Sequence, residues 1–254
     1  MRSSVYVLTP FAAAIGAVAS QPADSWVFGN SLFYLGPPSG NAHITKATYS
    51  IVPPSVPTEY ESASDEPWVS VWVGASSTAG DQDANLYQPI FNWSPDQESQ
   101  GCPASSDKWC VAASTYTPSG QLGQSYVTVP KNTKVDFEIA VVNSKVVQTV
   151  TMKGRTVSKE TDALTLALDS PLQYLYSSNE CYTGAGSCGN LAGYQITNLT
   201  VTLSEADTKF DQVMRLDRVT DSAFKSTDGG ITWHTDKIKV NSIDFDSSDD
   251  TQVQ

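Results

Sequence analysis

Two short stretches decide the fold: Trp68-Val69-Ser70-Val71-Trp72-Val73-Gly74 and Leu86-Tyr87-Gln88-Pro89-Ile90-Phe91-Asn92-Trp93. In the first stretch, valines at alternate positions would line one face of an extended strand, opposite both tryptophans. The valine face requires a core. On the other face the two tryptophans would alternate with the small residues Ser70 and Gly74, an arrangement that suits the binding of a ligand. We therefore expect two neighbouring strands of one sheet.

The second stretch contains an amide on an otherwise apolar face. Gln88 shares that face with Leu86 and Ile90. An amide buried there without a partner would cost about 1–3 kcal/mol. The pattern therefore predicts that Gln88 has a polar partner or lies at a cleft.

Short alternating segments separated by turn residues continue along the chain, with Lys134 to Val141 the clearest of them. No long helical period is present, and only one short helix is expected, near Ser204 to Arg215. This pattern predicts an all-β protein, a curved β-sandwich or jelly roll of two antiparallel sheets of the concanavalin A-like kind. We expect one such domain over residues 21–254, with an acidic, flexible tail from about residue 246.

The first twenty residues are typical of a secretory signal peptide. Arg2 precedes an apolar run from Val5 to Val18, and small residues suited to signal peptidase end at Ser20. No later apolar run is long enough to span a bilayer. The sequence therefore predicts a secreted, extracellular protein with no membrane partner.

Four cysteines allow three disulfide connectivities. Each close pair brackets a loop rich in Gly, Ser and Pro, so local pairing is favoured, Cys102 with Cys110 and Cys181 with Cys188. Asn198 begins a glycosylation sequon, and Asn92 begins a poorer one that is followed by a proline.

The formal net charge of −12 disfavours nucleic acid and anionic membranes as partners. The two histidines, His43 and His234, have no metal-ligand spacing, and no Gly-x-Ser-x-Gly nucleophile elbow is present. We expect a monomer with neither metal nor cofactor.

Glu180 lies near the end of an expected strand in which alternate residues can be assigned to the two faces. An unbroken strand would place it on one face with Tyr174, Tyr176 and Tyr182. A partly buried carboxyl among tyrosines is a candidate acid/base group, because burial raises its pKa. On the alternation alone, a structural glutamate at the rim of the adjacent cysteine loop is the favoured interpretation.

The ordered set of Ile44 to Pro53, Trp72-Val73-Gly74, Leu86-Tyr87-Gln88 and Glu180-Cys181-Tyr182 resembles the fungal glutamic peptidases, the eqolisins. The resemblance implies an acid endopeptidase with a protein or peptide substrate. Glu180 would activate a water and later protonate the leaving amine, while the Gln88 amide would stabilise the oxyanion. Trp72 would line the substrate groove.

Two other functions fit the same sandwich. The aromatic residues Trp68, Trp72, Tyr174 and Tyr176 are candidate substrate-binding residues, and they could equally stack on sugar rings in a carbohydrate-binding module. A polysaccharide lyase is a further alternative, although sparse cationic residues and the negative charge disfavour a polyanionic substrate.

Overall fold

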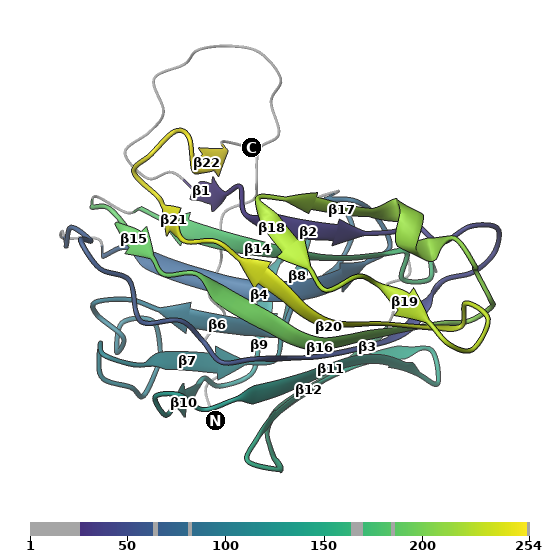
Figure 1. Cartoon of the computed structure of the whole chain (residues 1–254). Coiled ribbons are helices and arrows are strands. Elements are labelled where there is room, and N and C mark those ends of the chain that lie inside the picture. Colours follow the sequence, from purple (N-terminus) through teal and green to yellow (C-terminus); the bar gives the residue numbers. More distant parts are fainter. Residues whose placement is uncertain (1–25, 63–65, 81–82, 164–169, 184–185, 253–254) are drawn as a thin grey trace.

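The computed structural model describes residues 26–62, 66–80, 83–163, 170–183 and 186–252. The predicted signal peptide lies outside these residues. Two antiparallel sheets lie one over the other (Figure 1), which confirms the predicted sandwich.

The larger sheet has the spatial order β10 (Val127–Val129), β7 (Trp109–Ala112), β6 (Ile90–Trp93), β4 (Trp68–Ser76), β14 (Tyr174–Tyr182), β1 (Trp26–Gly29) and β22 (Thr251–Gln252). Short strands extend it on both sides. β2 (Leu32–Leu35) pairs with β14, and β17 (Met214–Asp217) pairs with β2. β5 (Leu86–Tyr87) pairs with β4, β8 (Ser114–Thr117) pairs with β5, and β9 (Gly120–Gly123) pairs with β8. β4 and β14 are therefore central, with neighbours on both sides.

The smaller sheet has the order β13 (Arg155–Ala163), β12 (Lys145–Met152), β11 (Val135–Val142), β3 (Ile44–Ile51), β16 (Tyr194–Leu203), β20 (Thr232–Val240) and β18 (Val219–Asp221), with β19 (Lys225–Ser226) also on β20. A separate pair joins β15 (Asn190–Leu191) and β21 (Ile243–Asp244). A 3₁₀ helix, η1 (Phe210–Val213), forms where the sequence predicted a short helix.

The core lies between the two sheets. Alternation turns the valines of β4 inward, and Val69, Val71 and Val73 are at most 1% exposed. They pack in one cluster with inward residues of β11 and β16, among them Phe137 and Ile196. Burial of this apolar area provides the main stabilisation of the sandwich.

The second deciding stretch pairs with the first, as predicted, but it is not one strand. β5 and β6 both pair with β4 and are separated by Gln88 and Pro89. Proline has no backbone N–H to donate to a ladder, which accounts for the break.

Both predicted disulfides are confirmed. Cys102 is bonded to Cys110, and Cys181 is bonded to Cys188. Each bond closes a local loop at an end of a strand of the larger sheet. Among the described residues, no helix is long and apolar enough to cross a membrane.

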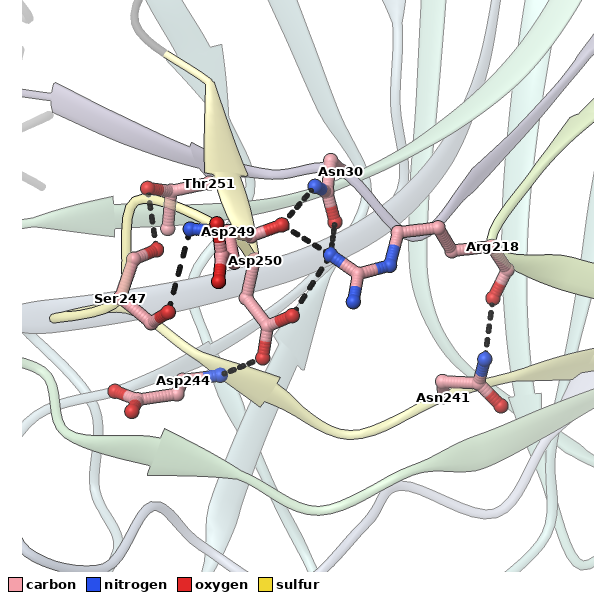
Figure 2. Close-up of polar contacts among 8 residues, drawn as sticks. All are labelled: Asn30, Arg218, Asn241, Asp244, Ser247, Asp249, Asp250 and Thr251. Atoms are coloured by element: carbon pink, nitrogen blue, oxygen red, sulfur yellow. Dashed lines mark hydrogen bonds and ion pairs between the residues drawn. The ribbon is translucent and has the colours of Figure 1, made fainter.

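Polar contacts hold the acidic segment before β22 (Figure 2). The Arg218 guanidinium donates to Asn30 Oδ1 at 3.1 Å, pairs with Asp250 Oδ1 at 2.8 Å, and donates to the Asp249 carbonyl. β22 then pairs with β1, where Gln252 lies opposite Phe28. The chain thus returns to the larger sheet beyond residue 246, and the flexibility of this tail stays a prediction from the sequence.

Candidate functional site

One face of the larger sheet, the face turned away from the smaller sheet, carries the residues singled out in the sequence. Cross-strand partners share a face, so the pairing of β14 with β4 orders them in rows. The rows are Tyr182 with Trp68, Glu180 with Ser70, Ser178 with Trp72, Tyr176 with Gly74, and Tyr174 with Ser76. We call this surface the site face.

Glu180 is buried on the site face, with 7% of its surface exposed. Burial raises the pKa of its carboxyl to about 8. The indole N–H of Trp72 offsets part of this rise, but it makes no hydrogen bond of normal geometry. Burial also raises the pKa of Tyr116 and of Tyr176, and the charge of Glu180 adds to both rises. Burial thus favours the neutral form of the Glu180 carboxyl.

Gln88 lies on the same face, on the other side of β4. Its backbone N–H donates to the Ser114 carbonyl at 2.9 Å, and its Nε2 donates to Gln121 Oε1 at 3.3 Å. Gln121 in turn donates to the Ser114 hydroxyl. The Gln88 amide is 4% exposed, and its Oε1 is buried without a hydrogen-bond partner in the described part of the chain.

Glu180 and Gln88 are not in the same row. Glu180 is opposite Ser70, whereas Gln88 lies against Gly74, where a Cβ atom would be 3.1 Å from the Gln88 Cβ. The four residues from Ser70 to Gly74 correspond to an offset of about 13 Å along the strand. Trp72 lies between the two rows on the same face. The backbone therefore places the expected dyad on one face but well apart.

Gly74 sets how closely Gln88 approaches β4. An alanine Cβ there would lie 2.7 Å from Leu86 Cδ1 and 3.1 Å from the Tyr87 carbonyl oxygen. We expect Gly74→Ala to destabilise the protein by about 1–3 kcal/mol through overpacking, measured by urea unfolding. Gly123→Ala is the matched control. An added Cβ at Gly123 would have no neighbour closer than 3.5 Å, and the backbone there is not in the left-handed region. Gly123→Ala should therefore have the smaller effect, and an equal effect of both would contradict this role of Gly74.

Two aromatic groups flank Glu180 along β14. Trp26, Trp68 and Tyr182 have ring centroids 5.4 to 5.8 Å apart on one side. On the other side Tyr176 contacts Tyr34 at 5.5 Å and Trp72 at 5.6 Å. The short residues of the two central strands lie between these groups.

The site face also contains buried polar atoms that have no hydrogen-bond partner in the described residues. They are Tyr34 Oη, Trp68 Nε1, Trp72 Nε1, Gln88 Oε1 and Asn92 Nδ2. Each buried polar group left unpaired costs about 1–3 kcal/mol. Unpaired groups are rare in native interiors, so their concentration on one face indicates a surface that pairs with a polar ligand or with water.

Sequence reasoning missed a pair of partly buried carboxyls on β13, Glu160 and Asp162. Burial and the neighbouring Asp162 raise the pKa of Glu160, on β13, to about 7. Asp162 accepts a hydrogen bond from Thr115 Oγ1 at 2.6 Å, and the buried Gln148 Nε2 donates to Thr115 at 2.7 Å. Polar residues at alternate positions of Arg155–Ala163 were the available signal, but they are also typical of a solvent-exposed edge strand.

Other predicted sites are at the surface or are not formed. The side chain of Asn198 is exposed, as a glycosylated asparagine requires, whereas Asn92 is fully buried. No group of three or more His, Cys, Asp or Glu side chains suited to a metal occurs among the described residues.

No family model and no curated protein matches the chain. Among solved structures, scytalido-glutamic peptidase with a transition state analog inhibitor is 13% identical, with a TM-score of 0.50 over 84% of this chain and 98% of the peptidase. SCP-B, a member of the eqolisin family in a complex with a tripeptide, is 11% identical, with a TM-score of 0.44 and the same two coverages of 84% and 98%. The carbohydrate binding module CBM66 from Bacillus subtilis is 9% identical, with a TM-score of 0.31 over 64% of this chain and 91% of the module.

The likeness shows a shared fold. The sandwich is similar to that of the glutamic peptidases, and the expected resemblance is confirmed at this level. At 13% identity the match identifies no catalytic residue, so the chemistry must be argued from the site face itself.

Proposed function

We propose that this chain is a secreted hydrolase of the glutamic-peptidase type, with a protein or peptide as its substrate. The observation that carries the proposal is the buried carboxyl of Glu180 on a face whose N–H donors Trp68 Nε1, Trp72 Nε1 and Asn92 Nδ2 have no partner among the described residues. The backbone of an extended peptide offers carbonyl oxygens to such donors. The two disulfides are typical of the oxidising environment outside the cell.

Glu180 is the acid/base group in this proposal. Its ionised form takes a proton from a water that attacks the peptide carbonyl carbon. The resulting oxyanion accepts a hydrogen bond from a side-chain amide of the site face, Gln88 in the dyad expected from the sequence. When the C–N bond breaks, Glu180 returns the proton to the leaving amine. One water is consumed, and no metal or cofactor is required.

The proposal predicts a pH–rate profile. Glu180 must be ionised to accept the proton, and its pKa of about 8 means that the ionised fraction falls roughly tenfold for each pH unit below that value. We therefore expect kcat/KM on a denatured protein to rise with pH towards about 8, and a pepstatin-type inhibitor to have no effect because no aspartate pair is involved. An optimum in acid solution, as the family resemblance implies, would contradict the assignment of Glu180 as the base in the free protein.

The carbohydrate-binding alternative rests on the partly exposed rings of Trp26, Trp68 and Tyr182. Binding to an insoluble glucan, lost in Trp68→Ala, together with no cleavage of a denatured protein at any pH, would favour that alternative over the peptidase.

A further inference from the structure

Asn92 lies in the same row of the site face as Glu180. β14 places Glu180 opposite Ser70, and β6 places Asn92 opposite Ser70 on the other side of β4. All three side chains are therefore on one face, and two strand spacings put the Cβ atoms of Glu180 and Asn92 about 10 Å apart. Only the short side chain of Ser70 lies between them.

The Asn92 amide is held at one end and unpaired at the other. Ser70 Oγ donates to Asn92 Oδ1 at 3.0 Å. The side chain is 0% exposed, yet its Nδ2 has no hydrogen-bond partner among the described residues. An unpaired buried amide N–H₂ next to a serine that fixes its orientation is a costly arrangement, and a ligand group or a water that accepts its hydrogen would remove the cost.

Gln88 occupies a different position. It lies against Gly74, four residues along β4 from Ser70, and its Nε2 already donates to Gln121. The free end of Gln88 is its Oε1, an acceptor, whereas the free end of Asn92 is a donor. A developing oxyanion requires a donor.

We infer that Asn92 is the amide that acts with Glu180, and that Ser70 positions it. In this arrangement the peptide carbonyl and the attacking water bind over Ser70, between the two side chains. Water adds to the carbonyl carbon as its proton passes to Glu180, and Asn92 Nδ2 donates to the carbonyl oxygen as it becomes negative. The C–N bond then breaks, and the proton on Glu180 passes to the leaving nitrogen. This inference rests on the proposed peptidase function for its chemistry, but its geometry can be tested separately.

The geometric test is a double-mutant cycle, measured by urea unfolding near pH 8 and needing no activity. Asn92→Asp is made in the wild type and in Glu180→Gln, and Gln88→Glu is made in the same two backgrounds as the matched control. A carboxylate introduced at position 92 would repel the ionised Glu180 across Ser70, and two like charges away from bulk water couple strongly. Distant groups are instead additive within about twofold in the unfolding constant. We expect the effect of Asn92→Asp to differ at least about tenfold between the two backgrounds, and that of Gln88→Glu to stay near additive. Should Asn92→Asp fail to fold, Ser70→Asp replaces it in the cycle, since Ser70 is in the same row.

The chemical test compares two amide removals that keep side-chain bulk. Asn92→Leu should lower kcat about 10²–10³-fold with little change in KM, the usual cost of one oxyanion donor, and Ser70→Ala should lower kcat by less. Gln88→Leu should have the smaller effect of the two amide variants.

Each result decides between the alternatives. Additivity between positions 92 and 180 overturns the pairing. A full loss in Gln88→Leu with normal turnover in Asn92→Leu overturns the inference while it supports the original dyad. Strong coupling in a protein that cleaves no peptide supports the pairing and defeats the proposed function.

Discussion

Replacing Glu180 with glutamine is expected to lower kcat/KM by about 10²–10⁴-fold, the usual contribution of a general base. Glutamine keeps the size of the side chain and has no basic oxygen that can accept the proton of the attacking water. The assay is cleavage of a denatured protein across the pH range in which the wild type is active.

Glu160→Gln is the matched control for this variant. Glu160 is also a carboxyl whose pKa burial raises, but it belongs to β13 of the smaller sheet. We expect Glu160→Gln to retain near wild-type activity. Equal losses in the two variants would point to a general effect of buried charge, and undiminished cleavage by Glu180→Gln would eliminate Glu180 as the base.

Much of the fold is predictable because the central strands have simple surroundings. β4 has a neighbour on each side and a core on one face, so the alternation of Val69, Val71 and Val73 is complete. β14 is likewise one continuous strand from Tyr174 to Tyr182. The alternation of side chains along it was therefore enough to predict that Glu180 shares a face with Tyr174 and Tyr176. The edge strand β13 is harder to recognise in the sequence, because its inward residues Ser158, Glu160 and Asp162 are polar and give no apolar alternation.

The composition of the site face could be predicted, but its rows could not. Which residue of β14 lies opposite which residue of β4 depends on the register between strands about one hundred residues apart in the chain. A shift of four residues would bring Glu180 level with Gly74 and Gln88. In the sequence, Asn92 stands out only as the start of a glycosylation sequon weakened by the proline that follows it, and only the register shows that it shares a row with Glu180.

The raised pKa of Glu180 has a consequence for stability as well as for catalysis. Burial raises the pKa of this carboxyl from the model-compound value of 4.5 to about 8 in the folded protein. Between these values the folded state binds more protons than the unfolded state, so the free energy of unfolding falls as the pH rises. The stability is complete below the unfolded pKa and is lost progressively as the pH approaches the folded pKa. Glu160, with its pKa near 7, adds a smaller change of the same sign.

We therefore expect the wild-type protein to be most stable in acid and to lose on the order of 5 kcal/mol of unfolding free energy between about pH 4 and pH 8 through Glu180. Glu180→Gln imitates the neutral carboxyl at every pH. It should match the wild type near pH 4, exceed it near pH 8, and flatten the pH dependence of the urea midpoint. Glu98→Gln, a change at an exposed carboxyl, should leave the slope unchanged. A Glu180→Gln variant that loses stability in parallel with the wild type would show that this carboxyl is not held neutral by burial, and would remove the basis for the expected rise in activity with pH.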